Sequence, residues 1–228
     1  MSYFNIVKTF NADNSFRNAA IIGKYDLQSF DITENFTGQL DLPLEWNVGC
    51  IVGNSGTGKT TIAKELFADN YITEFEYNKH KSILDEMPEN KSVEQITKTF
   101  NAVGFSSPTQ WIKPYVLLST GQQMRVNVAR AILSEKAITV FDEFTSTIDR
   151  MVAQIGCLAI SKAIKQQNKK FIAVSCHLDI VDWLEPDWIF NTNTMGFESN
   201  KKKDHHWNSK SMNIPINRYG KCLQSIII

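Results

Sequence analysis

Short apolar runs alternate with amphipathic segments along most of the chain. Runs with the length of buried strands occur at 48–52, 137–141, 171–175 and 188–191. Apolar positions at helical spacing occur at 60–67, 92–103, 120–134 and 152–166. Strands that alternate with helices predict an α/β fold, with a mostly parallel sheet covered by helices.

The remaining segments have weaker patterns. Residues 1–47 mix short apolar runs with polar breaks, so we expect a β-rich N-terminal part with a few turns. Residues 71–78 are compatible with another strand, whereas glycine and prolines interrupt 104–117. We therefore expect one domain over 1–198 with a small helical insertion at about 88–118, followed by a polar, poorly ordered tail at 199–228.

The composition is that of an ordinary globular protein. The 228 residues suffice for one well-packed domain, and 43% of them are hydrophobic. Lys plus Arg and Asp plus Glu both total 24, which argues against nucleic-acid binding through bulk charge but leaves a local basic patch open. No apolar run has the length of a signal peptide or a membrane span. The four cysteines form no Cys-x-x-Cys pair, so we expect a reducing, cytoplasmic location without a zinc site.

A phosphate-binding loop lies between the first buried strand and the helix that follows it. Gly53-Asn-Ser-Gly-Thr-Gly-Lys-Thr60 matches the pattern G-x-x-x-x-G-K-[ST] in full. Its glycines let the backbone approach phosphates closely, and its N–H groups and the positive helix end face the phosphate oxygens. Lys59 would reach the β- and γ-phosphates, and Thr60 would place a hydroxyl on Mg²⁺. The expected nucleotide-binding residues are Gly53, Asn54, Ser55, Gly56, Thr57, Gly58, Lys59, Thr60 and Thr61.

Two carboxylates end a later apolar strand, Ile138-Thr-Val-Phe-Asp-Glu143. In a parallel sheet the carboxyl ends of the strands converge on the ligand crevice. Asp142 is therefore expected to hold Mg²⁺, directly or through water, and Glu143 to act as the general base on the attacking water. Taken alone, such a pair is equally compatible with a helix cap or a solvated turn. The phosphate-binding loop in the same chain favours the catalytic interpretation.

The segment that starts at Leu118 resembles the signature motif of the ATP-binding-cassette (ABC) ATPases. Leu118-Ser-Thr-Gly-Gln-Gln-Met-Arg-Val-Asn-Val-Ala-Arg-Ala-Ile-Leu133 stands where that family usually begins Leu-Ser-Gly-Gly-Gln. Ser146-Thr-Ile-Asp149 is similar to the family's D-loop, and Ala173-Val-Ser-Cys-His177 resembles the strand that ends in its switch histidine. The motifs follow one another in the family's order, and the resemblance covers roughly residues 20–195.

The resemblance implies an ATPase of the P-loop class that binds ATP with Mg²⁺ and forms a head-to-tail homodimer when ATP is bound. The signature residues of one copy, Ser119, Thr120, Gly121 and Gln122, would then act in trans on the γ-phosphate held by Lys59 of the other copy. His177 would contact the γ-phosphate and help to position water, and Asp149 would link the two sites. Judged singly, Ser119 is better explained as a helix cap and His177 as a core histidine. The ordered set of motifs favours the functional interpretation of both.

Several positions depart from the family pattern. Thr120 replaces the first signature glycine, which is compatible with a negative φ at that position. The family's Q-loop glutamine has no counterpart in Ser82-Ile-Leu-Asp-Glu-Met-Pro88, so Asp85 or Glu86 is the candidate to stand near Mg²⁺ in its place. Tyr25 and Phe30 are the candidates to stack on adenine, and each is equally compatible with a core position.

A narrower resemblance concerns soluble ABC-type ATPases that are often fused to a GNAT-type acetyltransferase domain. It rests on Ser82–Pro88, Trp111–Tyr115, Asp142–Arg150 and Trp183–Trp188. This chain ends before such a domain would fit, so we expect no acetyltransferase activity.

Three functions remain open. The first is a soluble ATPase whose ATP-driven dimerisation acts on an unknown protein partner. The second is the ATPase subunit of an ABC membrane transporter, and the third is a nucleotide-dependent switch with little turnover. Glu143 argues against the switch, because a switch needs no general base.

Overall fold

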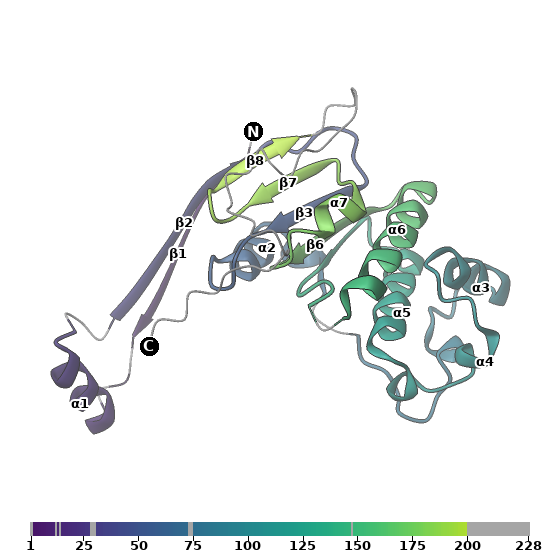
Figure 1. Ribbon diagram of the computed structural model, residues 1–228, viewed down its shortest axis with the longest axis horizontal. Helices are drawn as coiled ribbons and strands as arrows, with labels where there is room; N and C mark the ends of the chain where they lie inside the picture. Colours follow the sequence, from purple (N-terminus) through teal and green to yellow (C-terminus); the bar gives the residue numbers. More distant parts are fainter. Residues whose placement is uncertain are drawn as a thin grey trace.

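A six-stranded sheet forms the centre of the protein, with the strand order β4-β5-β6-β3-β7-β8 (Figure 1). The computed structural model describes residues 2–11, 13, 15–27, 31–72, 75–146 and 148–199. Its strands are β3 (Val48–Val52), β4 (Tyr71–Ile72), β5 (Ile138–Phe141), β6 (Lys170–Ser175), β7 (Trp188–Asn191) and β8 (Gly196–Ser199). The pairs among the first five strands are parallel and β8 is antiparallel to β7, so the predicted mostly parallel sheet is confirmed.

Alternate side chains of the central strands enter two separate cores, one on each face of the sheet. On β3, Cys50 and Val52 join one core and Ile51 joins the other, as the period of two in a strand requires. All three side chains are fully buried. These strands are apolar on both faces because both faces are covered.

Helices cover the two faces unequally. The larger core lies under α3 (Val93–Ala102), α5 (Thr120–Leu133) and α6 (Arg150–Gln166). The other core lies under α2 (Lys59–Phe67) and the inner half of an N-terminal ribbon. Shorter elements complete the chain: the 3₁₀ segments η1 (Ala68–Asn70), η2 (Leu84–Glu86) and η3 (Tyr115–Leu117), and the helices α4 (Pro108–Trp111) and α7 (Ile180–Leu184).

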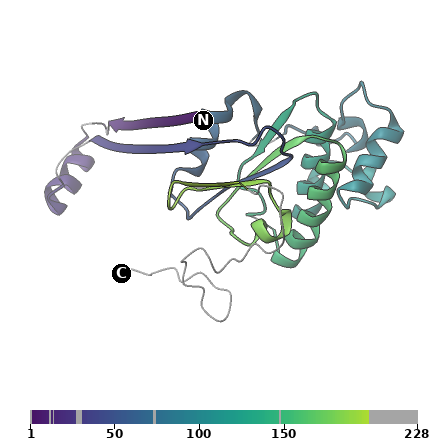
Figure 2. The same ribbon diagram turned by 90° about the horizontal axis from the view of Figure 1, so that it is seen from above.

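The N-terminal part is an arm that projects from the body of the protein (Figures 1 and 2). Strands β1 (Ser2–Asn11) and β2 (Asp31–Leu40) form an antiparallel ribbon, with α1 (Phe16–Tyr25) at its far end. The side chains of Phe4, Ile6 and Phe36 are buried at the inner end of the ribbon, whereas none of the described side chains of α1 is buried.

The two long strands agree with the expected β-rich N-terminal part over 1–47, and the helix between them was not expected. Ser15 caps its N-terminus by accepting a hydrogen bond from the Asn18 N–H, and Asp26 ends it in the left-handed conformation. The helix buries none of its side chains although its apolar positions have helical spacing, so the core does not depend on it.

Other differences from the expectations concern short elements. Among the described residues of the segment 71–78, only Tyr71–Ile72 form a strand, and 75–78 have no regular structure. Helix α7 and strand β8 were not expected, since five and four residues are too few for a periodic signal. Of the predicted tail, residues 200–228 lie outside the described residues. Among the described residues, no helix has the length and apolar content that a membrane crossing needs.

Candidate functional site

The glycine-rich loop joins the carboxyl end of β3 to the N-terminus of α2, as predicted. Gly58 caps α2 with a φ of 84°, a conformation that favours glycine. A Cβ at this position would lie 2.3 Å from a ring carbon of Phe36, so the buried ring of Phe36 also requires glycine there. The loop is therefore held in shape by the strand before it, the helix after it and the ribbon beside it.

The loop threonine meets the acidic strand end. Thr60 Oγ1 donates a hydrogen bond to Asp142 Oδ2 at 2.8 Å, although the two residues are 82 positions apart in sequence. Lys59 is buried at 7% exposure, and its Nζ donates to the carbonyl oxygen of Asn54 at 2.7 Å. A hydroxyl, a carboxylate and an ammonium group thus gather at one edge of the sheet.

The end of β7 supports the loop, which the sequence analysis did not anticipate. Asn193 Oδ1 accepts from the Asn54 N–H at 2.9 Å, and the hydroxyls of Thr192 and Thr57 are hydrogen-bonded. Asn191-Thr-Asn193 follows an apolar strand, and this polar run at a strand end was the available signal.

Glu143 lies in a tight turn directly after β5. Its φ is 50° and that of Thr145 is 66°, both in the left-handed region that costs a non-glycine residue about 1–2 kcal/mol. Two hydrogen bonds fix the turn: the Phe144 N–H donates to Val174 O at 2.9 Å, and the Glu143 N–H donates to Asp142 Oδ1 at 2.9 Å. The side chain of Glu143 is left exposed, in a place that the neighbouring backbone defines.

His177 follows β6, which lies between β5 and β3 in the sheet. The loop at the carboxyl end of β6, which contains His177, therefore lies between the loop of Lys59 and the turn of Glu143. The His177 N–H donates to Ser175 Oγ at 3.1 Å, and the half-buried imidazole lies outside the apolar core. The topology thus brings the three predicted catalytic residues to one edge of the sheet.

The predicted signature residues form the N-terminus of α5. Ser119 is the N-cap, and it forms a capping box with Gln122, whose Oε1 accepts from the Ser119 N–H at 3.0 Å. Thr120 is the first helical residue, so the helix itself gives it the negative φ that the sequence analysis required. Ser119 and Thr120 are exposed, whereas Gly121 is buried against α6, where a Cβ would lie 2.7 Å from Val152.

Asp149 caps the N-terminus of α6. Its Oδ1 accepts hydrogen bonds from the N–H groups of Met151 at 3.0 Å and Val152 at 3.3 Å. The predicted signature serine, Ser119, and the predicted D-loop aspartate, Asp149, therefore cap the N-termini of two helices that pack against each other at Gly121.

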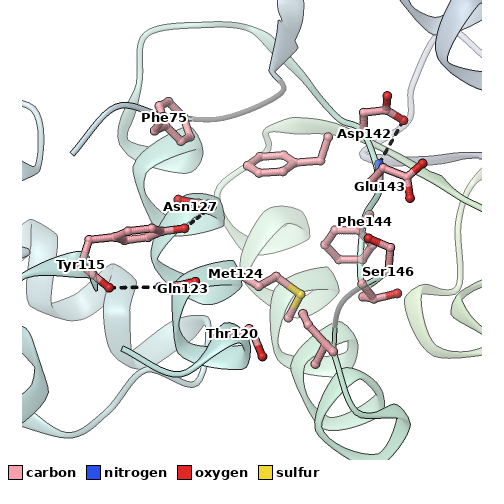
Figure 3. A pocket seen from close by; sticks show the side chains of 13 residues that line it. Phe75, Tyr115, Thr120, Gln123, Met124, Asn127, Asp142, Glu143, Phe144 and Ser146 are labelled. Atoms are coloured by element: carbon pink, nitrogen blue, oxygen red, sulfur yellow. Dashed lines mark hydrogen bonds between the residues drawn. The ribbon is translucent and has the colours of Figure 1, made fainter. Parts of the chain in front are cut away.

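A cavity of about 370 Å³ lies between the carboxylate turn and α5 (Figure 3). Asp142, Glu143 and Ser146 line one side, and Thr120 and Gln123 line the other. Its remaining lining residues are Phe75, Tyr115, Met124, Asn127, Phe141, Phe144, Thr145 and Ile148. Polar groups from the two predicted motifs thus face each other within one chain.

The chain after β4 borders this cavity through an aromatic cluster. Tyr77 stacks on Tyr115 with ring centroids 4.0 Å apart, and its hydroxyl donates to Asn127 Oδ1 at 2.9 Å. The Arg130 guanidinium lies 4.8 Å from the Tyr77 ring and 4.9 Å from the Phe75 ring. Burial raises the pKa of Tyr77, against the opposing influence of Arg130, so this hydroxyl stays protonated as a hydrogen-bond donor.

Asp85 and Glu86, the candidates for the missing Q-loop glutamine, lie on η2. Asp85 accepts from Ser82 Oγ at 2.7 Å, and the Ile83 N–H beside it donates to Lys113 O. Neither carboxylate lines the cavity of Asp142, whereas Phe75, ten positions before Asp85, does.

Of the two adenine-stacking candidates, Tyr25 lies on α1 at the far end of the arm, away from α2 (Figure 1). Phe30 lies outside the described residues. The aromatic ring that contacts the phosphate-binding loop is that of Phe36.

The sequence is similar to those of ATP-binding proteins of transport systems, although no family model matches the chain. A probable metal transport system ATP-binding protein of Thermotoga maritima is 27% identical over 179 residues, which are 69% of this chain and 73% of that protein. The ATP-dependent permease MDL1 of Candida albicans is 23% identical over 223 residues, which are 77% of this chain and 31% of the permease. The chain thus spans less than a third of the permease's length.

Solved structures with the same fold are ATP-binding cassettes and their transporters. A dimeric post-hydrolysis state of an ATP-binding cassette with bound ADP and phosphate aligns over 83% of this chain and 92% of its own, with a TM-score of 0.58 and 15% identity. A metal-chelate type ABC transporter in an inward-facing conformation aligns over 86% of this chain and 82% of its own, with a TM-score of 0.56 and 17% identity. This chain therefore has the fold of the ATP-binding-cassette ATPases, and its sequence resembles the ATP-binding proteins of transport systems.

Proposed function

We propose that this chain binds ATP with Mg²⁺ and hydrolyses it, and that two copies assemble head to tail around the nucleotide. The observation that carries the proposal is the hydrogen bond from Thr60 Oγ1 to Asp142 Oδ2 at 2.8 Å. It joins a complete phosphate-binding loop to an acidic strand end from a distant part of the sequence, in the arrangement that nucleotide hydrolysis requires.

The loop supplies the phosphate site. Its N–H groups and the N-terminus of α2 favour an anion, and Lys59 places a buried positive charge beside them. Lys59 already donates to Asn54 O within the loop, so its ammonium group is held at the site where β- and γ-phosphates would bind. We propose residues 53–61 as the nucleotide contacts.

The donor set fits Mg²⁺. A threonine hydroxyl and one carboxylate are hard oxygen ligands, and Mg²⁺ commonly takes one or two carboxylates together with phosphate oxygens and water. Within the described residues, no three His, Cys, Asp or Glu side chains gather as an all-protein metal cage. Thr60 and Asp142 would hold the ion, which when bound neutralises charge on the phosphates.

Glu143 is the proposed general base. Its turn keeps the carboxylate beside Asp142 yet exposed, so it can accept a proton from a water that attacks the γ-phosphate. His177, at the neighbouring strand end, would contact the same phosphate and orient that water. Because both side chains leave the sheet at its carboxyl edge, each acts from a backbone position that the strands fix.

Ser119 and its neighbours would complete the partner's site. Ser119 and Thr120 are exposed at a helix N-terminus, where N–H groups and the helix dipole attract anions. The solved ATP-binding cassette with bound ADP and phosphate is dimeric, which supports pairing of two copies here. Asp149, at the start of α6 beside this helix end, would link the two sites of the dimer.

Participation in a transport system is the second candidate. The Thermotoga maritima relative is a probable metal transport ATP-binding protein, and this chain covers 73% of it. A membrane permease that copurifies from detergent extracts would support this role. The alternative of a stand-alone ATPase akin to those fused to acetyltransferase domains rests on the segments quoted above, and a partner set without membrane proteins would favour it.

Steady-state ATP hydrolysis and equilibrium ATP binding test the proposal together. We expect Glu143→Gln to lose at least about a hundredfold in turnover while it keeps ATP affinity, because the base acts only on the attacking water. Lys59→Ala should lose ATP binding itself. Wild-type protein that binds no ATP would refute the proposal, and unchanged turnover in Glu143→Gln would favour a nucleotide-dependent switch.

A further inference from the structure

Arg150 connects three segments at the carboxyl edge of the sheet, and nothing in the sequence analysis gave it a role. It is the first residue of α6, directly after Asp149. Its Nε donates to Asp179 Oδ2 at 2.9 Å, and its second terminal nitrogen donates to Asp179 Oδ1. Its other terminal nitrogen lies 3.4 Å from Thr145 O and 3.3 Å from Thr145 Oγ1. The guanidinium face lies 4.8 Å from the ring of Trp183.

Each of the three segments carries one of the proposed functional residues. Thr145 belongs to the left-handed turn that contains Glu143. Asp179 lies two positions after His177 and is the N-cap residue of α7. Asp149 precedes Arg150 itself. One side chain therefore ties together the base, the histidine and the aspartate expected to link the two sites.

The chemistry of this contact requires arginine. The planar guanidinium carries donors on three nitrogens, so it can hold both oxygens of one carboxylate and still reach the Thr145 carbonyl. A lysine ammonium keeps the charge but lacks the fork and the flat face over Trp183. The group is partly exposed, with 35% of the Arg150 side chain accessible, so the value of the contact lies in its geometry more than in bulk stability.

We infer that Arg150 is a positioning residue that holds the side chains of Glu143 and His177 in the positions from which both reach the same phosphate. This rests on the proposed ATPase activity. Thr145 must hold a left-handed φ for the turn to aim Glu143, and Arg150 binds both the carbonyl and the hydroxyl of Thr145. The same side chain holds the loop after His177 through Asp179. The contacts of Arg150 within the described part of the chain are with Thr145, Asp179 and Trp183, and none of these residues belongs to the phosphate-binding loop. A change at Arg150 should therefore affect turnover and leave ATP affinity alone.

The first test separates turnover from binding. Arg150→Ala should lower kcat about a hundredfold, the loss expected from a small misplacement of reacting groups, with the KM and Kd for ATP within about twofold of wild type. Arg150→Lys should also lose most of the turnover while it keeps the charge and the fold. Arg17→Ala, an exposed arginine on α1, is the matched control and should match wild type. Wild-type kcat in Arg150→Lys and Arg150→Ala would overturn the inference.

The second test asks whether Arg150 acts through Glu143. In a Glu143→Gln background, Arg150→Ala should reduce the residual turnover by less than about threefold, because residues that act as a unit are not additive. A further hundredfold loss in that background would show that Arg150 acts elsewhere, and would overturn the inference.

Hydrogen exchange decides the matter even if the protein hydrolyses no ATP, in which case the proposed function fails separately. In Arg150→Lys, amides of both 142–148 and 176–182 should exchange faster, while those of 53–61 stay unchanged. Faster exchange confined to the first turn of α6 would show a purely local role and would overturn the inference.

Discussion

Gly49 and Trp188 show how one atom controls the packing of the sheet. A Cβ on Gly49 of β3 would lie 2.1 Å from a ring carbon of Trp188 on the paired strand β7. Trp188 is fully buried and cannot swing into solvent. We predict that Gly49→Ala lowers the free energy of unfolding by about 1–3 kcal/mol or more, seen as a lower denaturant midpoint.

Gly23→Ala is the matched control for this prediction. Gly23 lies inside α1, and a Cβ there would meet no atom within 4 Å. Alanine is the better helix former by about 0.5–1 kcal/mol, so this variant should keep or slightly raise the midpoint. Equal losses in both variants would contradict the packing argument.

Two buried thiols give a second test at single residues. Burial raises the pKa of Cys157 to about 12 and also raises that of Cys50, with each thiol fully enclosed. Because the thiolate is the reactive form, both should resist alkylation in the folded protein at pH 8. In a Cys222→Ser background we predict one fast-reacting thiol, Cys176, and three after denaturation. Rapid native labelling of Cys157 would contradict the described core.

The same shifts set a direction for stability against pH. An unfolded cysteine loses its proton near its ordinary pKa of 9.0, whereas folded Cys157 keeps it until about pH 12. The unfolded state therefore binds fewer protons in this window, so this contribution to stability is present below pH 9 and is lost as the pH rises through it.

Helices α3 and α5 begin with the same capping motif, so matched variants of the two caps can separate an effect on stability from an effect on function. Ser92 and Ser119 each form a capping box with the glutamine three positions later. Replacing either serine with alanine should cost about 1 kcal/mol of stability, since each loses a cap. Only Ser119→Ala should also impair ATP-driven pairing and turnover, because only this serine is expected to meet a partner's nucleotide.

Denaturant midpoints, ATPase rates and sedimentation of Ser92→Ala and Ser119→Ala check this prediction. If the two variants lose turnover equally, Ser119 is no more than a helix cap. If Ser119→Ala alone loses turnover at matched stability, the exposed helix end has a role beyond the fold.

Elements with strong local signals could be predicted from sequence, and elements that depend on distant partners could not. Strand β3, the loop after it and helix α5 carry dense patterns, namely a continuous apolar run, a fixed spacing of glycines and a capped amphipathic helix. The arm helix α1 buries none of its side chains, so nothing in the core required a helix at this place. Helix α7 and strand β8 have five and four residues, which are too few for a periodic signal.

The candidate site likewise has residues that sequence motifs predict and supporting contacts that they do not. The sequence motifs named Lys59, Thr60 and Asp142, and the structure brings the last two within 2.8 Å. The support from Asn193 and the bridge of Arg150 to Asp179 join residues far apart in the chain, and no spacing rule predicts them. Such supporting contacts depend on which strand ends become neighbours, which only the folded topology decides.

Across the entire protein, the sheet gathers one half of the proposed catalytic site at its carboxyl edge, and α5 presents the proposed other half outward. The loop of Lys59, the turn of Glu143 and the segment of His177 come from the neighbouring strands β3, β5 and β6. Ser119 and Thr120 are exposed at the N-terminus of α5, and Thr120 lines the cavity across from Asp142 and Glu143. A second copy of the chain would bring its exposed signature residues to the exposed phosphate-binding loop of the first copy.

The mass of Glu143→Gln in solution, with and without Mg²⁺-ATP, tests this account most directly. Removing the base should leave binding intact and trap the nucleotide-bound pair, so we predict a change from monomer to dimer only when ATP and Mg²⁺ are both present. The double variant Glu143→Gln, Ser119→Ala should stay monomeric under the same conditions. A Glu143→Gln protein that binds ATP yet remains a monomer would contradict the head-to-tail site.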